Sequence, residues 1–126
     1  MTDVLFKCVI PGRPGILKNS KKLIRAGGRV FPVSSDKYKK FEAFAYMHIT
    51  KARKGMLIDF PVNVCMKFYC KNHAHEFDLS NAYQGLEDVL QKALIISNDK
   101  LIYSHDGSRK IFDDENERIE IEITAL

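Results

Sequence analysis

The segment from Leu79 to Leu94 constrains the fold more than any other, because its apolar residues recur with the period of an α-helix. They stand at positions 79, 82, 83, 86, 89, 90, 93 and 94, which is the spacing of an amphipathic helix. Asp78 directly precedes the segment and is the residue type expected at a helix N-cap. We therefore expect a helix that begins after Asp78 and packs one face on the rest of the fold.

Several other segments have the alternation or the apolar runs of β-strands. The segment 61–70 places Val62, Val64, Met66 and Phe68 on one face and polar residues on the other. The segment 118–126 alternates in the same way, with its isoleucines directed inward. We also expect a buried strand at 4–10 and a strand from about 101 to 110.

A second helix is expected after Ser34 or Ser35, either of which is a suitable N-cap. Its apolar stripe comprises Tyr38, Phe41, Ala45, His48 and Ala52, widened by Phe44 and Ile49, and Gly55 ends it. The segment 11–29, rich in proline, glycine and basic residues, reads as a long loop, with a brief extended piece at 30–31.

These elements predict one domain over residues 1–126, of the α/β class with α+β character. We expect a mixed sheet of about four strands packed with two main helices. No segment reaches the roughly 18 apolar residues of a membrane span. The three cysteines, without a framework spacing, suggest reduced thiols and a cytoplasmic protein.

The net charge of +4 conceals an uneven distribution along the chain. Residues 1–54 hold 13 Lys and Arg against three acidic residues, a net charge of +10, whereas residues 55–126 hold 7 against 13, a net charge of −6. A basic half can bind a polyanion while a carboxylate-rich half performs chemistry. A solvated surface with uneven charge would produce the same count.

The carboxylates of the second half suggest a metal site. A helical wheel places Glu87 on the polar face of the 79–94 helix, and Asp78 at its start. If the following strand pairs beside the one ending near Cys70, the turn that carries Asp99 returns toward Asp78. Converging carboxylates suit Mg²⁺. Alternatively, Asp78 is simply a cap, Asp99 a turn residue and Glu87 a solvated charge.

The stretch from Asp78 to Lys110 resembles the RusA family of Holliday-junction resolvases. DLSN at 78–81, EDVLQ at 87–91 and ND at 98–99 stand at the order and spacing of the family's motifs. In the first half, PGRPGILKNSKK, GGR and SSDKYKKFE are similar to the family's DNA-binding region. The resemblance covers essentially the whole chain.

This resemblance implies a homodimer that binds four-way branched DNA and nicks it symmetrically, in recombination and repair. The cofactor would be Mg²⁺, with Mn²⁺ as a possible substitute, and no small molecule or membrane would be needed. By position, Asp78 and Asp99 match the family's metal ligands. The cation would polarise a phosphate oxygen and activate water for phosphodiester hydrolysis.

Two positions depart from the family's pattern. Ser80 stands where the family has a second aspartate, and Gln84 where it has a catalytic lysine. Ser80 could hold a water, and Gln84 could hydrogen-bond the phosphate. We hypothesise that Glu87 replaces the missing carboxylate by reaching back toward Ser80. The missing cation could come from Lys92, Lys100 or Lys110.

The expected phosphate contacts lie in the first half of the chain. Basic side chains neutralise phosphates, and glycines let the backbone approach them. The candidates are Lys18, Asn19, Lys21, Lys22, Arg25, Arg29, Lys37, Lys39 and Lys40.

The sequence also admits two other interpretations. Cys65, Cys70, His73 and His75 could hold zinc, but the two cysteines fall on opposite faces of one strand. Cys8 reads as a core residue. The alternative function is a weakly active or inactive protein that binds branched DNA as a dimer, which Ser80 and Gln84 favour and the two aspartates oppose.

Overall fold

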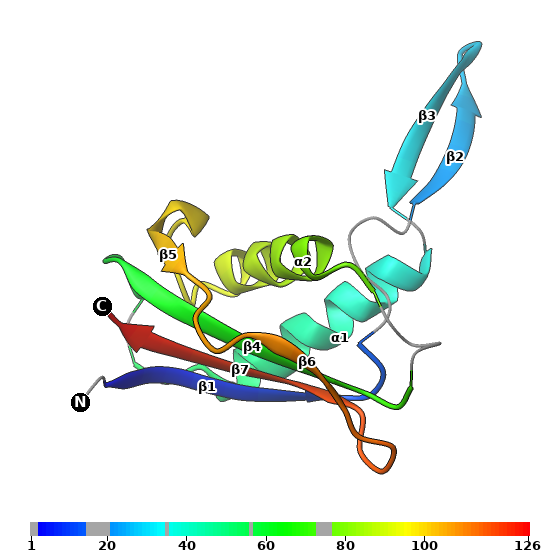
Figure 1. The fold of residues 1–126 in the computed structure, drawn as a ribbon. Helices are drawn as coiled ribbons and strands as arrows, with labels where there is room; N and C mark the ends of the chain where they lie inside the picture. Colours follow the sequence, from blue (N-terminus) through cyan, green and yellow to red (C-terminus); the bar gives the residue numbers. More distant parts are fainter. Residues whose placement is uncertain (1–2, 15–20, 35, 56, 73–76) are drawn as a thin grey trace.

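The computed structural model describes residues 3–14, 21–34, 36–55, 57–72 and 77–126, which form a sheet covered on one face by two helices, with a separate hairpin (Figure 1). Within this part of the chain, no helix combines the length and the apolar character needed to cross a membrane. The elements, in chain order, are β1 (Val4–Pro11), β2 (Lys21–Ala26), β3 (Arg29–Ser34), α1 (Asp36–Ala52), β4 (Val62–Cys70), α2 (Leu79–Lys92), the short 3₁₀ helix η2 (Asp99–Leu101), β5 (Ile102–Ser104), β6 (Arg109–Phe112) and β7 (Arg118–Ala125).

The main sheet is mixed, as predicted, and has five strands. Its order is β1-β7-β4-β5, with β6 also paired to β4. β7 pairs antiparallel with both β1 and β4, whereas β5 and β6 pair parallel with β4. The sheet has one strand more than the four expected, because the segment expected to form one strand from about 101 to 110 contains two, β5 and β6.

Between β5 and β6, the middle of β4 has no strand partner on this side. The loop 105–108 forms hydrogen bonds with β4 there, and each of them involves a side chain. Ser108 Oγ accepts a hydrogen bond of 2.9 Å from the Met66 amide. His105 Nδ1 lies 2.8 Å from the carbonyl oxygen of Val64. The carboxamide of Asn63 bonds the backbone of Asp106 in both directions. The edge of β4 is therefore satisfied across the gap between β5 and β6.

The core lies between the inner face of the sheet and the two helices (Figure 1). The alternation predicted for β4 and β7 is confirmed, since their inner residues are all buried. Cys8 is also buried, and burial raises the pKa of its thiol to about 11, which keeps it protonated. The fully buried large side chains are Ile10, Ile49, Val62, Met66, Phe68, Leu86, Leu90, Ile96, Ile119, Ile121 and Ile123.

The helix α1 is confirmed, but its apolar stripe is narrower than predicted. Tyr38, Ala45 and Ile49 are buried, whereas Phe44 remains 40% exposed. His48 is half-buried and makes an edge contact with the Phe44 ring, with 4.6 Å between ring centroids.

Both ends of α2 have well-defined caps. At the start, Asp78 is the predicted N-cap and accepts a hydrogen bond from the Ser80 amide. At the end, Leu94 adopts a left-handed φ of 59°. The Ile95 amide then donates to Leu90 O, and the Leu94 amide to Gln91 O, which is the Schellman arrangement.

The segment expected to be a loop contains a β-hairpin, so that prediction is wrong. β2 pairs antiparallel with β3, and Gly27 and Gly28 form the turn between them. Their φ values of 59° and 76° suit a type I′ turn, for which glycine is favoured. Figure 1 shows the hairpin projecting from the body directly before α1.

We predict that Leu86→Ala lowers the free energy of unfolding by about 2–5 kcal/mol, because Leu86 is fully buried and truncation leaves a cavity. Urea unfolding followed by circular dichroism measures the change. Leu94→Ala is the matched control, since Leu94 is 56% exposed and should lose less than about 1 kcal/mol. Equal losses in the two variants would contradict the assigned core.

Candidate active site

Asp78 stands at the start of α2 with half of its carboxylate engaged. Its Oδ1 accepts the Ser80 amide at 2.9 Å, which fixes the side chain at the helix end. Among the residues that the structure describes, Oδ2 has no protein partner, and the residue is exposed. A carboxylate held in this way keeps one oxygen for a cation or a donor group.

Asp99 opens η2, beyond the other end of α2. Its amide donates to Gln91 Oε1 at 3.0 Å, which ties the turn to the last helical residues. Asn98 caps η2 by accepting the Lys100 amide at 2.8 Å. The Asp99 carboxylate is exposed and has no partner within the described ranges. It can therefore accept a ligand from outside the chain.

The two aspartates do not meet within one chain, so the expectation that a single chain joins them at one ion is wrong. They flank a helix of 14 residues, which spans about 20 Å at 1.5 Å per residue. The chain does return beside β4, but in parallel, with Ile102 opposite Val62 at the start of that strand. Asp78 follows the end of the same strand, so the two acids lie at opposite ends of α2 (Figure 1).

Glu87, in the middle of α2, is paired with His105. Its Oε1 lies 2.8 Å from His105 Nε2, and the two side chains are 18% and 23% exposed. The Tyr83 ring stacks on the imidazole at a centroid distance of 4.2 Å. His105 Nδ1 contacts Val64 O, so both ring nitrogens face atoms that can only accept.

This environment favours the imidazolium form of His105. Donation to both acceptors requires a proton on each ring nitrogen, which only the charged ring has. The hydrogen bond to Glu87 raises the pKa of His105 above its ordinary value, against the opposing effect of burial. The pair therefore joins α2 to β4 and to the loop after β5.

The structure gives no support to Glu87 as the replacement for the missing carboxylate. Glu87 lies about 10 Å along the helix axis from Ser80, and its carboxylate is hydrogen-bonded to His105 instead. It cannot reach the Asp78 end without breaking that pair. Ser80 and Gln84 are exposed on α2, and Asn81 is half-buried.

The three candidate lysines have different surroundings. Lys92 Nζ pairs with Glu42 at 3.1 Å, so its charge is neutralised. Lys100 is exposed beside Asp99. Lys110 Nζ lies 5.3 Å from the centre of the Phe77 ring. Phe77 is the residue directly before Asp78 in the chain.

The predicted phosphate contacts gather on the hairpin and on the start of α1. Lys21, Lys22, Arg25 and Arg29 belong to β2 and β3, whose backbone alone is described, and Lys39 and Lys40 are exposed on the first turns of α1. Lys18 and Asn19, and the side chain of Lys37, lie outside the described residues. Their role in binding DNA stays a prediction.

Nothing in the described residues forms a ready metal cluster. No group of three or more His, Cys, Asp and Glu side chains gathers there in a way that could hold an ion. Cys65 is half-exposed and Cys70 buried, consistent with opposite faces of β4. His73 and His75 lie outside the described ranges.

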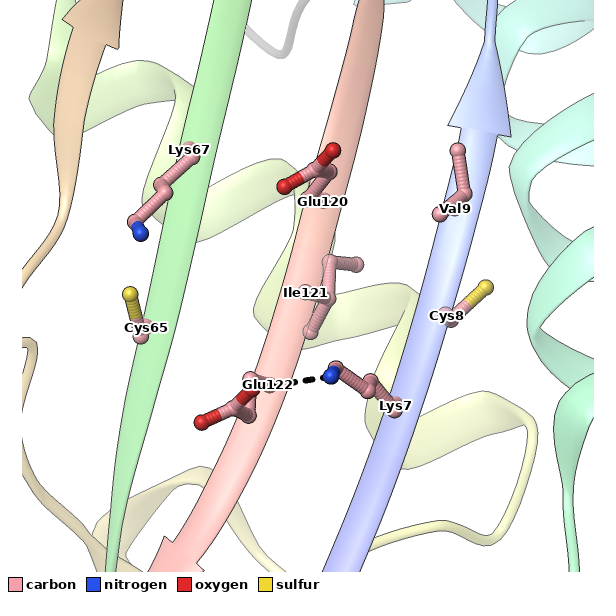
Figure 2. A pocket seen from close by; sticks show the side chains of 8 residues that line it. All are labelled: Lys7, Cys8, Val9, Cys65, Lys67, Glu120, Ile121 and Glu122. Atoms are coloured by element: carbon pink, nitrogen blue, oxygen red, sulfur yellow. Dashed lines mark ion pairs between the residues drawn. The ribbon is translucent and has the colours of Figure 1, made fainter. Parts of the chain in front are cut away.

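A pocket of about 330 Å³ lies on the outer face of the sheet, and neither aspartate lines it (Figure 2). Lys7, Cys65, Lys67, Glu120 and Glu122 supply its polar groups. Lys7 Nζ and Glu122 Oε2 form an ion pair of 3.7 Å there. Because opposite charges alternate across this face, it does not resemble a carboxylate site for a cation.

Sequence reasoning did not identify His105 as a partner of Glu87. The two are separated by a helix end, η2 and β5, and no spacing rule relates them. The sequence offers only weak indications of this pair: His105 follows a short strand, and Tyr83 lies one helical turn before Glu87.

Comparison with known proteins gives two findings. Residues 11–124 match the family described as "Endodeoxyribonuclease RusA". Over 94 residues the chain is 30% identical to the "Crossover junction endodeoxyribonuclease RusA" of Aquifex aeolicus (strain VF5), a match covering 75% of this chain and 72% of that relative.

We predict that the contribution of the Glu87–His105 pair to stability depends on pH. A raised pKa in the folded state means that the stabilisation is complete below the unfolded pKa of about 6.5. It is lost as the pH rises through the folded value. The free energy of unfolding is measured with urea for the wild type and for Glu87→Gln between pH 5.5 and 9. The two values should differ by about 1 kcal/mol at pH 5.5 and become equal toward pH 9. A difference independent of pH would contradict a charged His105.

Proposed function

Because this chain belongs to the RusA endodeoxyribonuclease family, we propose that it is a Mg²⁺-dependent nuclease that resolves four-way DNA junctions by paired phosphodiester hydrolysis. The observation that carries the proposal is the match of residues 11–124 to the family. The name of the Aquifex relative, which specifies crossover junctions, supports the choice of substrate.

We propose further that the site is completed by two copies of the chain. Asp78 and Asp99 each present a carboxylate without a described partner, but at opposite ends of α2. In a two-fold dimer, each surface meets the same surface of the other copy. An antiparallel approach of two α2 helices would bring Asp78 of one copy to Asp99 of a second copy at two equivalent places, as two symmetric nicks require.

The residues have distinct roles in this proposal. Asp78 and Asp99 of a second copy would hold Mg²⁺, for which carboxylate oxygens are suitable ligands. Bound there, the ion would stabilise the charge that develops on the phosphate. Ser80 and Gln84 are exposed on the turns of α2 that follow Asp78 and can hydrogen-bond water or a phosphate oxygen.

The basic hairpin and the start of α1 would bind the arms of the junction. The segments 21–34 and 37–40 carry seven lysines and arginines and no acidic residue. Such contacts read the backbone and shape of DNA, and salt weakens them. The hairpin projects from the body, so it can follow a DNA arm beyond the sheet (Figure 1).

A second candidate function is supported by one observation. By resemblance to the family's motifs, Ser80 and Gln84 stand where a carboxylate and a cation would be expected. A chain with these replacements could bind a branched junction as a dimer without cutting it efficiently.

We predict that the wild type nicks a mobile four-way junction only when Mg²⁺ or Mn²⁺ is present. Asp78→Asn should slow nicking by about 100-fold or more, because a carboxylate ligand is lost. Asparagine is as good an N-cap as aspartate, so the fold should be unaffected. The rate is measured on denaturing gels, with Asp114→Asn, an exposed acid elsewhere, as the control. A junction that shifts on a native gel but stays intact in both metals would favour the binding protein.

A mixing experiment tests whether each site uses two copies. Asp78→Asn and Asp99→Asn chains are refolded together, and each should be inactive alone. A mixed dimer would keep one intact site, with Asp78 from one chain and Asp99 from the other. We predict that the mixture recovers nicks in one strand but not paired nicks. A mixture that stays inactive would contradict a shared site.

A further inference from the structure

The ammonium of Lys110 lies over the ring of Phe77, the residue that directly precedes Asp78 in the chain. β6 pairs parallel with β4 and sets Lys110 opposite Phe68, whose side chain is fully buried beneath the helices. Residues opposite each other in a ladder share a face, so Lys110 lies on the α2 side of the sheet. Its Nζ is 5.3 Å from the centre of the Phe77 ring, and Phe77 precedes Asp78 directly.

The Phe77 ring gives this lysine a fixed platform. It meets Phe68 edge-on, with 5.1 Å between centroids and 69° between planes. Because Phe68 is part of the core, the Phe77 ring is anchored to the sheet. An ammonium over an aromatic face gains about 0.5–1 kcal/mol at a partly exposed site, and its N–H groups remain available to an anion.

The charge of Lys110 is not neutralised within the described part of the chain. No carboxylate there forms an ion pair with it, and the residue is half-buried. By contrast, Lys92 is paired with Glu42, and Arg118 is held by Asp113 and Glu120. Lys110 therefore combines a defined position on Phe77 with a charge that no described carboxylate compensates.

We infer that Lys110 is the cation that binds the reacting phosphodiester at the Asp78 end of α2. The inference rests on the proposed nuclease function and assigns a residue to it. A phosphodiester carries one negative charge and is repelled by the Asp78 carboxylate. An ammonium at this end of α2 offsets that repulsion and can hydrogen-bond a non-bridging oxygen.

The test variant removes the charge and keeps the packing. Lys110→Met preserves an unbranched stem and a sulfur that contacts aromatic rings favourably, so the Phe77 contact should survive. Lys110→Arg keeps the charge. Lys67→Ala is the matched control, because Lys67 lies on the adjacent strand but lines the pocket on the opposite face (Figure 2).

Nicking is measured under single-turnover conditions with saturating protein, and junction binding is measured separately by gel shift. Lys110→Met should reduce the nicking rate about 10-fold or more while the dissociation constant changes less than about 3-fold. Lys110→Arg should recover most of the rate, and Lys67→Ala should match the wild type. Unaltered nicking by Lys110→Met, or a loss produced by Lys100→Ala instead, would overturn the inference while leaving the nuclease function intact.

A wild type that binds the junction but never nicks it would refute the proposed nuclease function. The salt dependence of junction binding would then test whether Lys110 contacts a phosphate. A phosphate contact contributes about one unit to the slope of log K against log salt. The slope should fall by about that amount in Lys110→Met and not in Lys67→Ala. An unchanged slope would overturn the inference, and a wild type without affinity for the junction would overturn both proposals.

Discussion

The parallel pairing of β5 with β4 is the constraint on which the rest of this structure depends. Antiparallel neighbours can be joined by a tight turn, but parallel neighbours need a crossover that carries the chain back to where the first strand began. Here α2 is that crossover, and its apolar face covers the inner face of the sheet. The arrangement buries the core and at the same time separates the two ends of the crossover.

That separation organises the chemistry of the molecule. The carboxylates at the two ends of α2 are exposed and have oxygens available, whereas Glu87, in the middle, is bound to His105 and serves to join α2 to the sheet. A largely buried carboxylate is costly without a partner, so the pairing of Glu87 with a histidine is physically expected. Asp78 and Asp99, the two described carboxylates proposed to bind metal, therefore lie at the margins of the sheet and not over its centre.

Most of the architecture could be predicted from local patterns. Alternation at 62–70 and 118–126, and the helical period at 79–94, depend on residues close together in sequence, and the structure confirms them. The hairpin at 21–34 was missed, although Gly27 and Gly28 between two extended segments are a usual sign of one. The long basic flanks made the segment read as a loop.

The candidate site was less predictable. The capping role of Asp78 follows from local chemistry and is confirmed, but the distance from Asp78 to Asp99 depends on whether β5 runs parallel or antiparallel to β4. Sequence patterns do not distinguish these directions. For the same reason, no local rule relates Glu87 to His105, or Lys110 to Phe77, because each pair is brought together by strand pairing.

The loop at 105–108 has a consequence for self-association. By filling hydrogen-bonding positions of β4 with the side chains of His105 and Ser108, it denies a foreign strand an uninterrupted row of amides and carbonyls. Strand-by-strand growth into fibrils is thereby hindered at this border of the sheet.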